Sequence, residues 1–149
     1  MLRTTKQLQS EASAFVPCPQ DKRAVRAWIE AAQEKAGDAD NETVSIGTRF
    51  EAAYDAAFFV ALAALNAAGW KHRPVDGHHA FVLEASCAAV GASVATFDRL
   101  DAVREVRNQK YAGIERTQAD LRDAQATFEE FSKIAIHWLQ AHHGKLLQP

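Results

Sequence analysis

The chain has 149 residues, of which 48% are hydrophobic and 24% are charged, and its formal net charge is −2. This composition excludes a disordered chain, and 17 basic against 19 acidic residues exclude a broadly basic surface, so DNA is not an expected partner. The two cysteines, Cys18 and Cys87, exclude a disulfide scaffold and predict reduced thiols in a cytoplasmic protein. About one residue in five is alanine, the best helix former, so we predict one all-α domain over residues 1–149.

Glycines and prolines divide the chain into six segments with helical apolar spacing, at about 3–15, 21–36, 45–68, 77–90, 94–112 and 117–143. They predict an up-and-down antiparallel helical bundle of four main helices plus one or two short N-terminal helices, with no competing strand pattern. A helix-ending glycine with positive φ is expected after five of the segments, at Gly37, Gly69, Gly91, Gly113 and Gly144.

No targeting or membrane segment is predicted. Residues 1–10 are polar and lack the apolar core of a signal peptide. The longest uninterrupted apolar run, Ala56 to Leu65, is too short to cross a bilayer and predicts the middle of a buried helix. We therefore expect a cytoplasmic protein that does not engage a membrane.

The segments 45–68 and 117–143 carry the clearest helix signals. Thr48 and Glu51 have capping-box spacing and predict a helix start at Thr48, while Thr117 or a neighbour is expected to cap the last helix. In the last segment a narrow stripe steps by three and four residues, through Leu121, Ala124, Phe128, Phe131, Ala135, Trp138 and His142.

The segment 94–112 places several polar side chains opposite its core stripe. At about 100° per residue, one helix face carries Arg104, Arg107, Asn108 and Tyr111. Arginine suits phosphate groups, and a neighbouring asparagine could position a ribose hydroxyl or orient the arginine. The alternative is a solvated face whose acids and bases pair with one another.

Two histidines, His78 and His79, follow Gly77 at the predicted start of the segment 77–90. One of them could supply an imidazole to the Arg107 site, but only one can face it, because adjacent helical residues point about 100° apart. The alternative is local packing or capping. The preceding stretch from Lys71 is the most basic part of the chain and could contact RNA phosphates or stay solvated.

No metal or cofactor is predicted. The histidines form no HExxH pattern, and the chain has no paired-cysteine motif, Gly-rich phosphate loop or dinucleotide fingerprint. The acidic stretch from Asp38 to Glu42 lacks the central glycine and distal glutamate of a calcium loop.

Several motifs, in order, resemble those of bacterial HEPN-type helical domains over about residues 21–143. They are Arg49-Phe50, Ala53-Tyr54-Asp55-Ala56, Gly69-Trp70-Lys71-His72-Arg73, Gly77-His78-His79 and the stretch LDAVREVRNQKY from Leu100 to Tyr111. The resemblance implies a helical bundle that pairs as a homodimer. It also implies a metal-independent endoribonuclease of a toxin–antitoxin or defence system, with a nucleotidyltransferase as the antitoxin partner.

The resemblance assigns Arg107 as the family's signature arginine and Asn108 as its polar neighbour, with Arg104, His78 and His79 in support. The histidine that follows in the family's signature is absent, and Tyr111 lies nearest to its place. A phenol, with a pKa near 10, is a poorer base at neutral pH than an imidazole. Tyr111 is also the candidate acceptor of a nucleotidyl group from the partner enzyme.

Three functions stay open at this point. The first is an endoribonuclease or RNA-binding protein, in which a 2′-hydroxyl attacks the adjacent phosphate and Arg107 stabilises the developing charge. The second is a non-catalytic helical module that dimerises and engages a nucleotidyltransferase or another protein. In the third, the Arg107–Asn108 face only holds a dimer together, through acidic residues of the same helix in the second copy.

Overall fold

The computed structural model describes residues 1–149 and consists of six α-helices, a two-stranded sheet and two 3₁₀ turns. The elements are α1 (Thr5–Ala12), β1 (Phe15–Pro17), α2 (Lys22–Ala39), α3 (Ile46–Ala67), β2 (Trp70–His72), α4 (His78–Val90), α5 (Val94–Asn108), the turn Gln109–Ala112, α6 (Gln118–His143) and the turn Gly144–Leu147.

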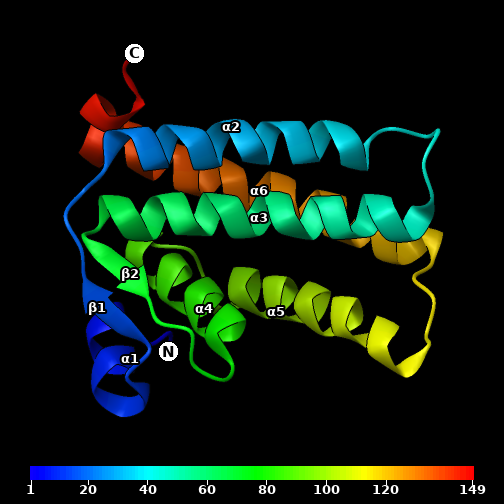
Figure 1. Ribbon diagram of the computed structural model, residues 1–149, viewed down its shortest axis with the longest axis horizontal. Coiled ribbons are helices and arrows are strands. Elements are labelled where there is room, and N and C mark those ends of the chain that lie inside the picture. Colours follow the sequence, from blue (N-terminus) through cyan, green and yellow to red (C-terminus); the bar gives the residue numbers. More distant parts are fainter.

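The four longest helices α2, α3, α5 and α6 run alternately in opposite directions along the chain (Figure 1). The central helix α3 packs against α2, α4 and α6, while α5 packs against α4 and α6. The shorter α4 carries the chain from the β2 strand back to the start of α5 (Figure 1). The predicted all-α, up-and-down helical bundle is therefore confirmed.

The core of the bundle is built around α3, whose alanines Ala56, Ala61 and Ala64 are completely buried. Their small side chains let neighbouring helices approach closely, and large side chains such as Phe50 and Phe131 fill the remaining space. By length and composition α3 could cross a membrane, yet 78% of its apolar window is buried inside the protein. That burial is typical of the core helix of a soluble bundle, as the sequence predicted for the run Ala56 to Leu65.

Two helix starts were predicted, and only one is confirmed. Thr117 caps α6: its side chain accepts a hydrogen bond from Asp120 N, and the Asp120 side chain accepts one from Thr117 N. The predicted capping box at Thr48 is wrong, because α3 begins three residues earlier. Ser45 is the N-cap, and its hydroxyl accepts from the Thr48 amide.

A short antiparallel sheet was not predicted from the sequence. It pairs Phe15 with His72 and Pro17 with Trp70 and so joins the start of the chain to the end of α3. The strands have three residues each, too few for an alternating pattern to show. The sheet is the one departure from a purely helical architecture.

The glycine prediction holds at three of its five positions. Gly69, Gly91 and Gly113 have positive φ and end or follow a helical segment as expected. It is wrong at Gly37, which lies inside α2, and at Gly144, whose φ of −53° is right-handed. Both continue a helical backbone, because the chain does not reverse direction at either residue.

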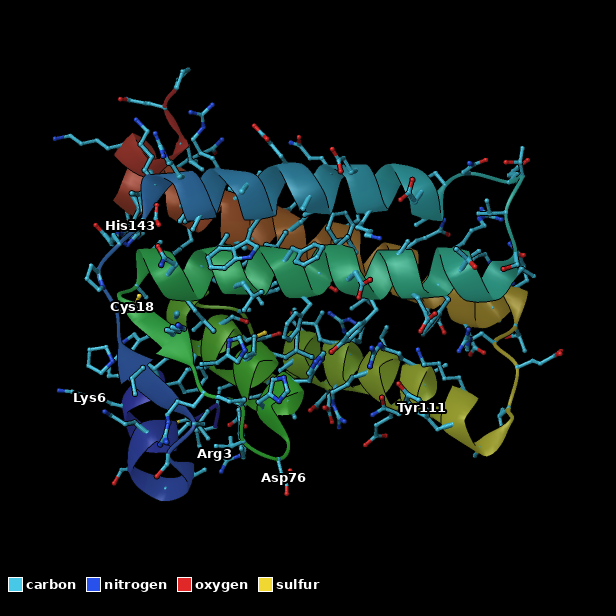
Figure 2. All side chains as sticks on the ribbon, in the orientation of Figure 1. Arg3, Lys6, Cys18, Asp76, Tyr111 and His143 are labelled. Atoms are coloured by element: carbon cyan, nitrogen blue, oxygen red, sulfur yellow. The ribbon has the colours of Figure 1, made fainter.

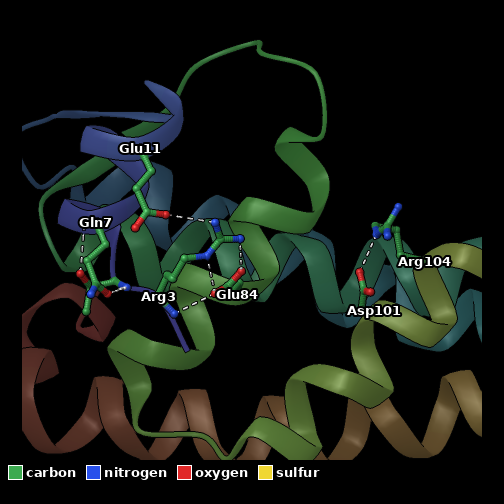
Figure 3. A network of polar contacts seen from close by, with 7 residues as sticks. Arg3, Gln7, Glu11, Glu84, Asp101 and Arg104 are labelled. Atoms are coloured by element: carbon green, nitrogen blue, oxygen red, sulfur yellow. Dashed lines mark hydrogen bonds and ion pairs between the residues drawn. The ribbon is translucent and has the colours of Figure 1, made fainter. Parts of the chain in front are cut away.

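The N-terminal segment is held to α4 by an ion pair. Arg3 donates three hydrogen bonds to the Glu84 carboxylate, two from its guanidinium and one from its backbone amide (Figure 3). The carboxylate is largely buried, and the charged hydrogen bonds lower the pKa of Glu84 against the opposing effect of burial. This contact, like the sheet, connects distant parts of the sequence.

Candidate functional site

The end of α5 presents two arginines with different surroundings. Arg104 Nε donates to Asp101 Oδ1 at 2.8 Å (Figure 3). Its Nη2 lies 3.8 Å from Glu105 Oε1. Its charge is therefore partly compensated within the helix, as the alternative of an internally paired face predicted.

Arg107 has no carboxylate partner. Its guanidinium lies 5.2 Å from the centre of the Tyr54 ring, in a cation–π contact, and its Nη1 donates to Asn108 Oδ1 at 3.4 Å. Its Nε is buried and donates no hydrogen bond. Glu51 and Asp55 of α3 are near enough to interact with its charge but form no ion pair with it. An arginine with unused hydrogen-bond donors and no ion pair is suited to an anionic ligand.

The two histidines at the start of α4 make separate contacts. His78 Nδ1–H donates to Val75 O at 3.1 Å, and the His78 ring stacks on His72. His79 Nδ1 lies 2.8 Å from the Tyr54 hydroxyl, and its ring stacks on Phe58 with centroids 4.3 Å apart. The histidine start of α4 is confirmed, and the local packing proposed as the alternative is present for both rings.

A single surface hollow of about 480 Å³ brings these residues together. It is lined by the loop from Pro74 to Gly77, the first turn of α4 and the last turns of α5. Five residues singled out from the sequence border it: His78, His79, Arg104, Arg107 and Asn108. The two segments are joined through Tyr54 of α3, which touches both His79 and Arg107.

Burial and neighbouring charges keep the His79 imidazole neutral. Desolvation is the largest cause, and the positive charges of His78 and Arg107 add to it, so that the pKa of His79 falls to about 4. Burial raises the pKa of Tyr54, so its phenol stays protonated. At neutral pH the pair is therefore an uncharged imidazole and an uncharged hydroxyl.

The direction of the hydrogen bond between these two groups sets which imidazole nitrogen carries the ring hydrogen, and either group can be the donor. The Tyr54 hydroxyl has His79 Nδ1 as its one hydrogen-bond partner, so its proton is satisfied when it donates to that nitrogen. The ring hydrogen then resides on Nε2, which is the nitrogen left for a molecule in the hollow. In this tautomer His79 is a hydrogen-bond donor toward the ligand.

Tyr111, which the sequence places on the Arg107 face, does not line the hollow. The α-helix ends at Asn108, and Tyr111 falls in the following 3₁₀ turn, where the spacing of side chains changes. It is 76% exposed, beyond the end of α5 and away from the loop of Asp76 (Figure 2). Its neighbour Lys110 pairs with Glu51 of α3.

Tyr54 was not predicted as a site residue, although it lies in the motif Ala53-Tyr54-Asp55-Ala56. Its side chain is 1% exposed and belongs to the core. The available signal was its hydroxyl, because a buried tyrosine surrounded by alanine and phenylalanine needs a polar partner from another element. That partner is His79.

Comparisons and metal-binding potential add no further assignment. No group of three or more His, Cys, Asp or Glu side chains is arranged to hold a metal ion. No family model matches the chain, and neither a curated protein nor a solved structure is similar enough to count as a match. Function is therefore argued from the hollow itself.

Proposed function

We propose that the hollow between α4 and α5 binds the phosphate backbone of RNA and cleaves it without a metal ion. The observation that carries the proposal is the placement of the neutral His79 imidazole and the Arg107 guanidinium, which forms no ion pair, in one hollow, both in contact with Tyr54. A proton acceptor beside a phosphate-binding cation is the minimum that RNA cleavage by its own 2′-hydroxyl requires.

The chemistry would proceed by transfer of the 2′-hydroxyl proton to His79. For this, Nε2 carries the lone pair and Nδ1–H donates to the Tyr54 oxygen, and the bound phosphate must raise the pKa of His79 from about 4 so that the imidazole holds the proton. The 2′-oxygen forms a bond to phosphorus and the 5′-oxygen leaves, taking a proton from water, while His79 returns its proton to solvent. The products are a 2′,3′-cyclic phosphate and a 5′-hydroxyl, and Arg107 stabilises the added negative charge.

The test is cleavage of a labelled single-stranded RNA in EDTA by the wild type and by three variants. His79→Asn should lower cleavage by about 100-fold or more while RNA stays bound, because it removes the proton acceptor. Arg107→Gln should weaken binding and cleavage together, and Arg122→Gln, a change at an exposed α6 arginine, should alter neither. A 2′-deoxy substitution at the cleaved nucleotide should abolish the reaction. Cleavage that survives both site variants would refute the proposal.

A second candidate is a non-catalytic binding module, and two observations favour it. When the Tyr54 hydroxyl donates to His79 Nδ1, the ring hydrogen is on Nε2, an arrangement that holds a phosphate rather than accepting a proton. In addition, Tyr111 is 76% exposed and open to modification by a nucleotidyltransferase partner. In this function the RNA in the assay stays intact while bound, and protein from its own cells carries a nucleotidyl mass on Tyr111 that Tyr111→Phe lacks.

The expected homodimer, toxin–antitoxin or defence setting and bacterial source belong to the same proposal, since they follow from the HEPN resemblance. A dimer would place two hollows in one particle. Sedimentation of the active protein at micromolar concentration tests this directly. A monomer that still cleaves RNA would refute a site shared between two copies.

A further inference from the structure

A second and larger cavity lies where β1 leads into α2, and its lining residue His72 stacks on His78 of the α4–α5 hollow. It has a volume of about 680 Å³, which is in the range of small-molecule sites. The N-terminal part of α2, the C-terminal part of α3 and the hairpin strand β2 form its walls. Figure 2 shows Cys18, one of its lining residues, where the chain leaves β1.

The walls of this cavity are aromatic and aliphatic. Trp28 from α2 and Trp70 from β2 both line it, together with Leu62 and Leu65 of α3. Trp28, Trp70 and Leu62 are only partly buried, so they retain apolar surface that a ligand could cover. Indole side chains offer large rigid faces suited to a flat aromatic ring.

One buried side-chain amide in the cavity, that of Asn66, has a nitrogen without a hydrogen-bond partner. Asn66 is 5% exposed, and its Oδ1 accepts from the Asp21 amide at 2.8 Å. This hydrogen bond fixes the orientation of the side-chain amide, because a backbone N–H requires the oxygen and not the nitrogen. The Asn66 Nδ2 donates to no group of the protein. The protein does not enclose the Asn66 Nδ2 atom completely, so this donor remains available to an acceptor in the cavity.

The charged residues around the cavity are mainly cationic. Lys22, Arg23 and Lys71 line it and pair with no acidic side chain, while Lys22 Nζ donates to Pro149 O at 3.4 Å. The single acidic residue among the lining side chains, Asp21, already accepts hydrogen bonds from two amides in the first turn of α2. The cavity thus combines apolar walls, one free hydrogen-bond donor and an excess of positive charge at its edge.

We propose that this cavity binds a small aromatic anion. The ring lies among Trp28, Trp70 and the two leucines, a polar atom of the ligand accepts from Asn66 Nδ2, and its negative charge faces Lys71 and Lys22. Cationic aromatic molecules are disfavoured by the same side chains. The site is separate from the α4–α5 hollow and does not depend on RNA binding there.

The test uses three probes with the same ring and different charge: indole-3-acetate, indole and tryptamine. Titrations followed by calorimetry and by the side-chain amide signals in a ¹H–¹⁵N spectrum should show binding of indole-3-acetate, with a shift of the Asn66 amide pair. Tryptamine should bind at least about tenfold more weakly, because its ammonium group meets the lysines.

Variants localise the binding. Asn66→Asp keeps the acceptor for the Asp21 amide but removes the donor, and it should weaken indole-3-acetate binding about tenfold or more. Lys71→Glu, at an exposed position that does not endanger folding, should weaken it several-fold, whereas Lys6→Glu and Arg107→Gln should leave it unchanged. Equal affinity for the three probes, or binding that Arg107→Gln abolishes and Lys71→Glu leaves intact, would overturn the proposal.

Discussion

The low pKa of His79 makes a prediction about stability that needs no knowledge of the ligand. Its pKa in the folded protein is about 4, against 6.5 for an ordinary histidine. Between these two pH values the unfolded chain binds a proton that the folded protein does not, so lowering the pH favours unfolding. Above pH 6.5 both states are neutral at this residue, and its contribution to the pH dependence vanishes.

The size of this pH effect follows from the one proton that the His79 side chain takes up when the protein unfolds. The free energy of unfolding changes by at most about 1.4 kcal/mol per pH unit in this window. Because His79 is only half-buried and partly screened by solvent, we expect it to account for about 1 kcal/mol of lost stability between pH 6.5 and about 4.5. Burial also lowers the pKa of His72 and His143 and adds losses of the same sign.

The variant His79→Asn isolates the contribution of His79 to the pH dependence of the free energy of unfolding. Asparagine places an amide oxygen near the position of Nδ1, so the Tyr54 hydroxyl keeps an acceptor, but nothing at this position titrates. Urea unfolding of wild type, His79→Asn and the exposed-site control His137→Asn, measured from neutral pH down to about 4.5, gives the three slopes. The His79→Asn curve should fall less steeply than the other two. Parallel curves for all three proteins would refute the inference that His79 is held neutral by its surroundings.

Other changes should move stability in defined directions, each measurable by urea unfolding at neutral pH. Tyr54→Phe leaves His79 Nδ1 without its partner and should lower the free energy of unfolding by about 1 kcal/mol. The same substitution should raise the His79 pKa in an NMR titration, and an unchanged pKa would contradict the hydrogen bond. Glu84→Gln replaces the charged acceptor of three hydrogen bonds from the N-terminal segment and should cost about 1–3 kcal/mol, an effect that high salt should reduce. Gly91→Ala should destabilise by about 1 kcal/mol through its φ of +76° alone, since nothing lies near the added methyl group, whereas Gly37→Ala inside α2 should stabilise by roughly 0.5–1 kcal/mol. Equal effects at the two glycines would show that backbone conformation is not what separates them.

The helices could be predicted because their signals are local. The α6 stripe positions Leu121, Ala124, Phe131 and Ala135 are buried as their three- and four-residue spacing predicted, and Phe128 is partly buried. The core positions Leu100 and Val103 in α5 are buried as well. Toward the end of α6 the buried position is Leu139 rather than the predicted His142, which is exposed. The predicted stripe follows a 3.5-residue repeat, and that repeat drifts from a 3.6-residue helix over several turns.

The site could be predicted only in part, because its decisive contacts join residues far apart in the sequence. The Arg107–Asn108 turn and the His78–His79 pair were recognised separately, but nothing in either segment specifies that α3 brings them together through Tyr54. The position of Tyr111 depended on where α5 ends, and its final turn has no strong stop signal before Gly113. Helix boundaries and long-range pairings are thus what separated the predicted site from the observed one.

The short sheet has a consequence for how the α4–α5 hollow meets a ligand. Arg73, the first residue after β2, donates from its amide to Ala14 O at 2.8 Å and from its guanidinium to Ser13 O at 3.3 Å. On the other side, the loop ends at His78, whose amide donates to Val75 O. Only four residues, Pro74 to Gly77, therefore lie between two fixed ends, and one of them is a proline. This loop is already ordered before a molecule enters the hollow, so binding causes little further loss of conformational entropy in the loop.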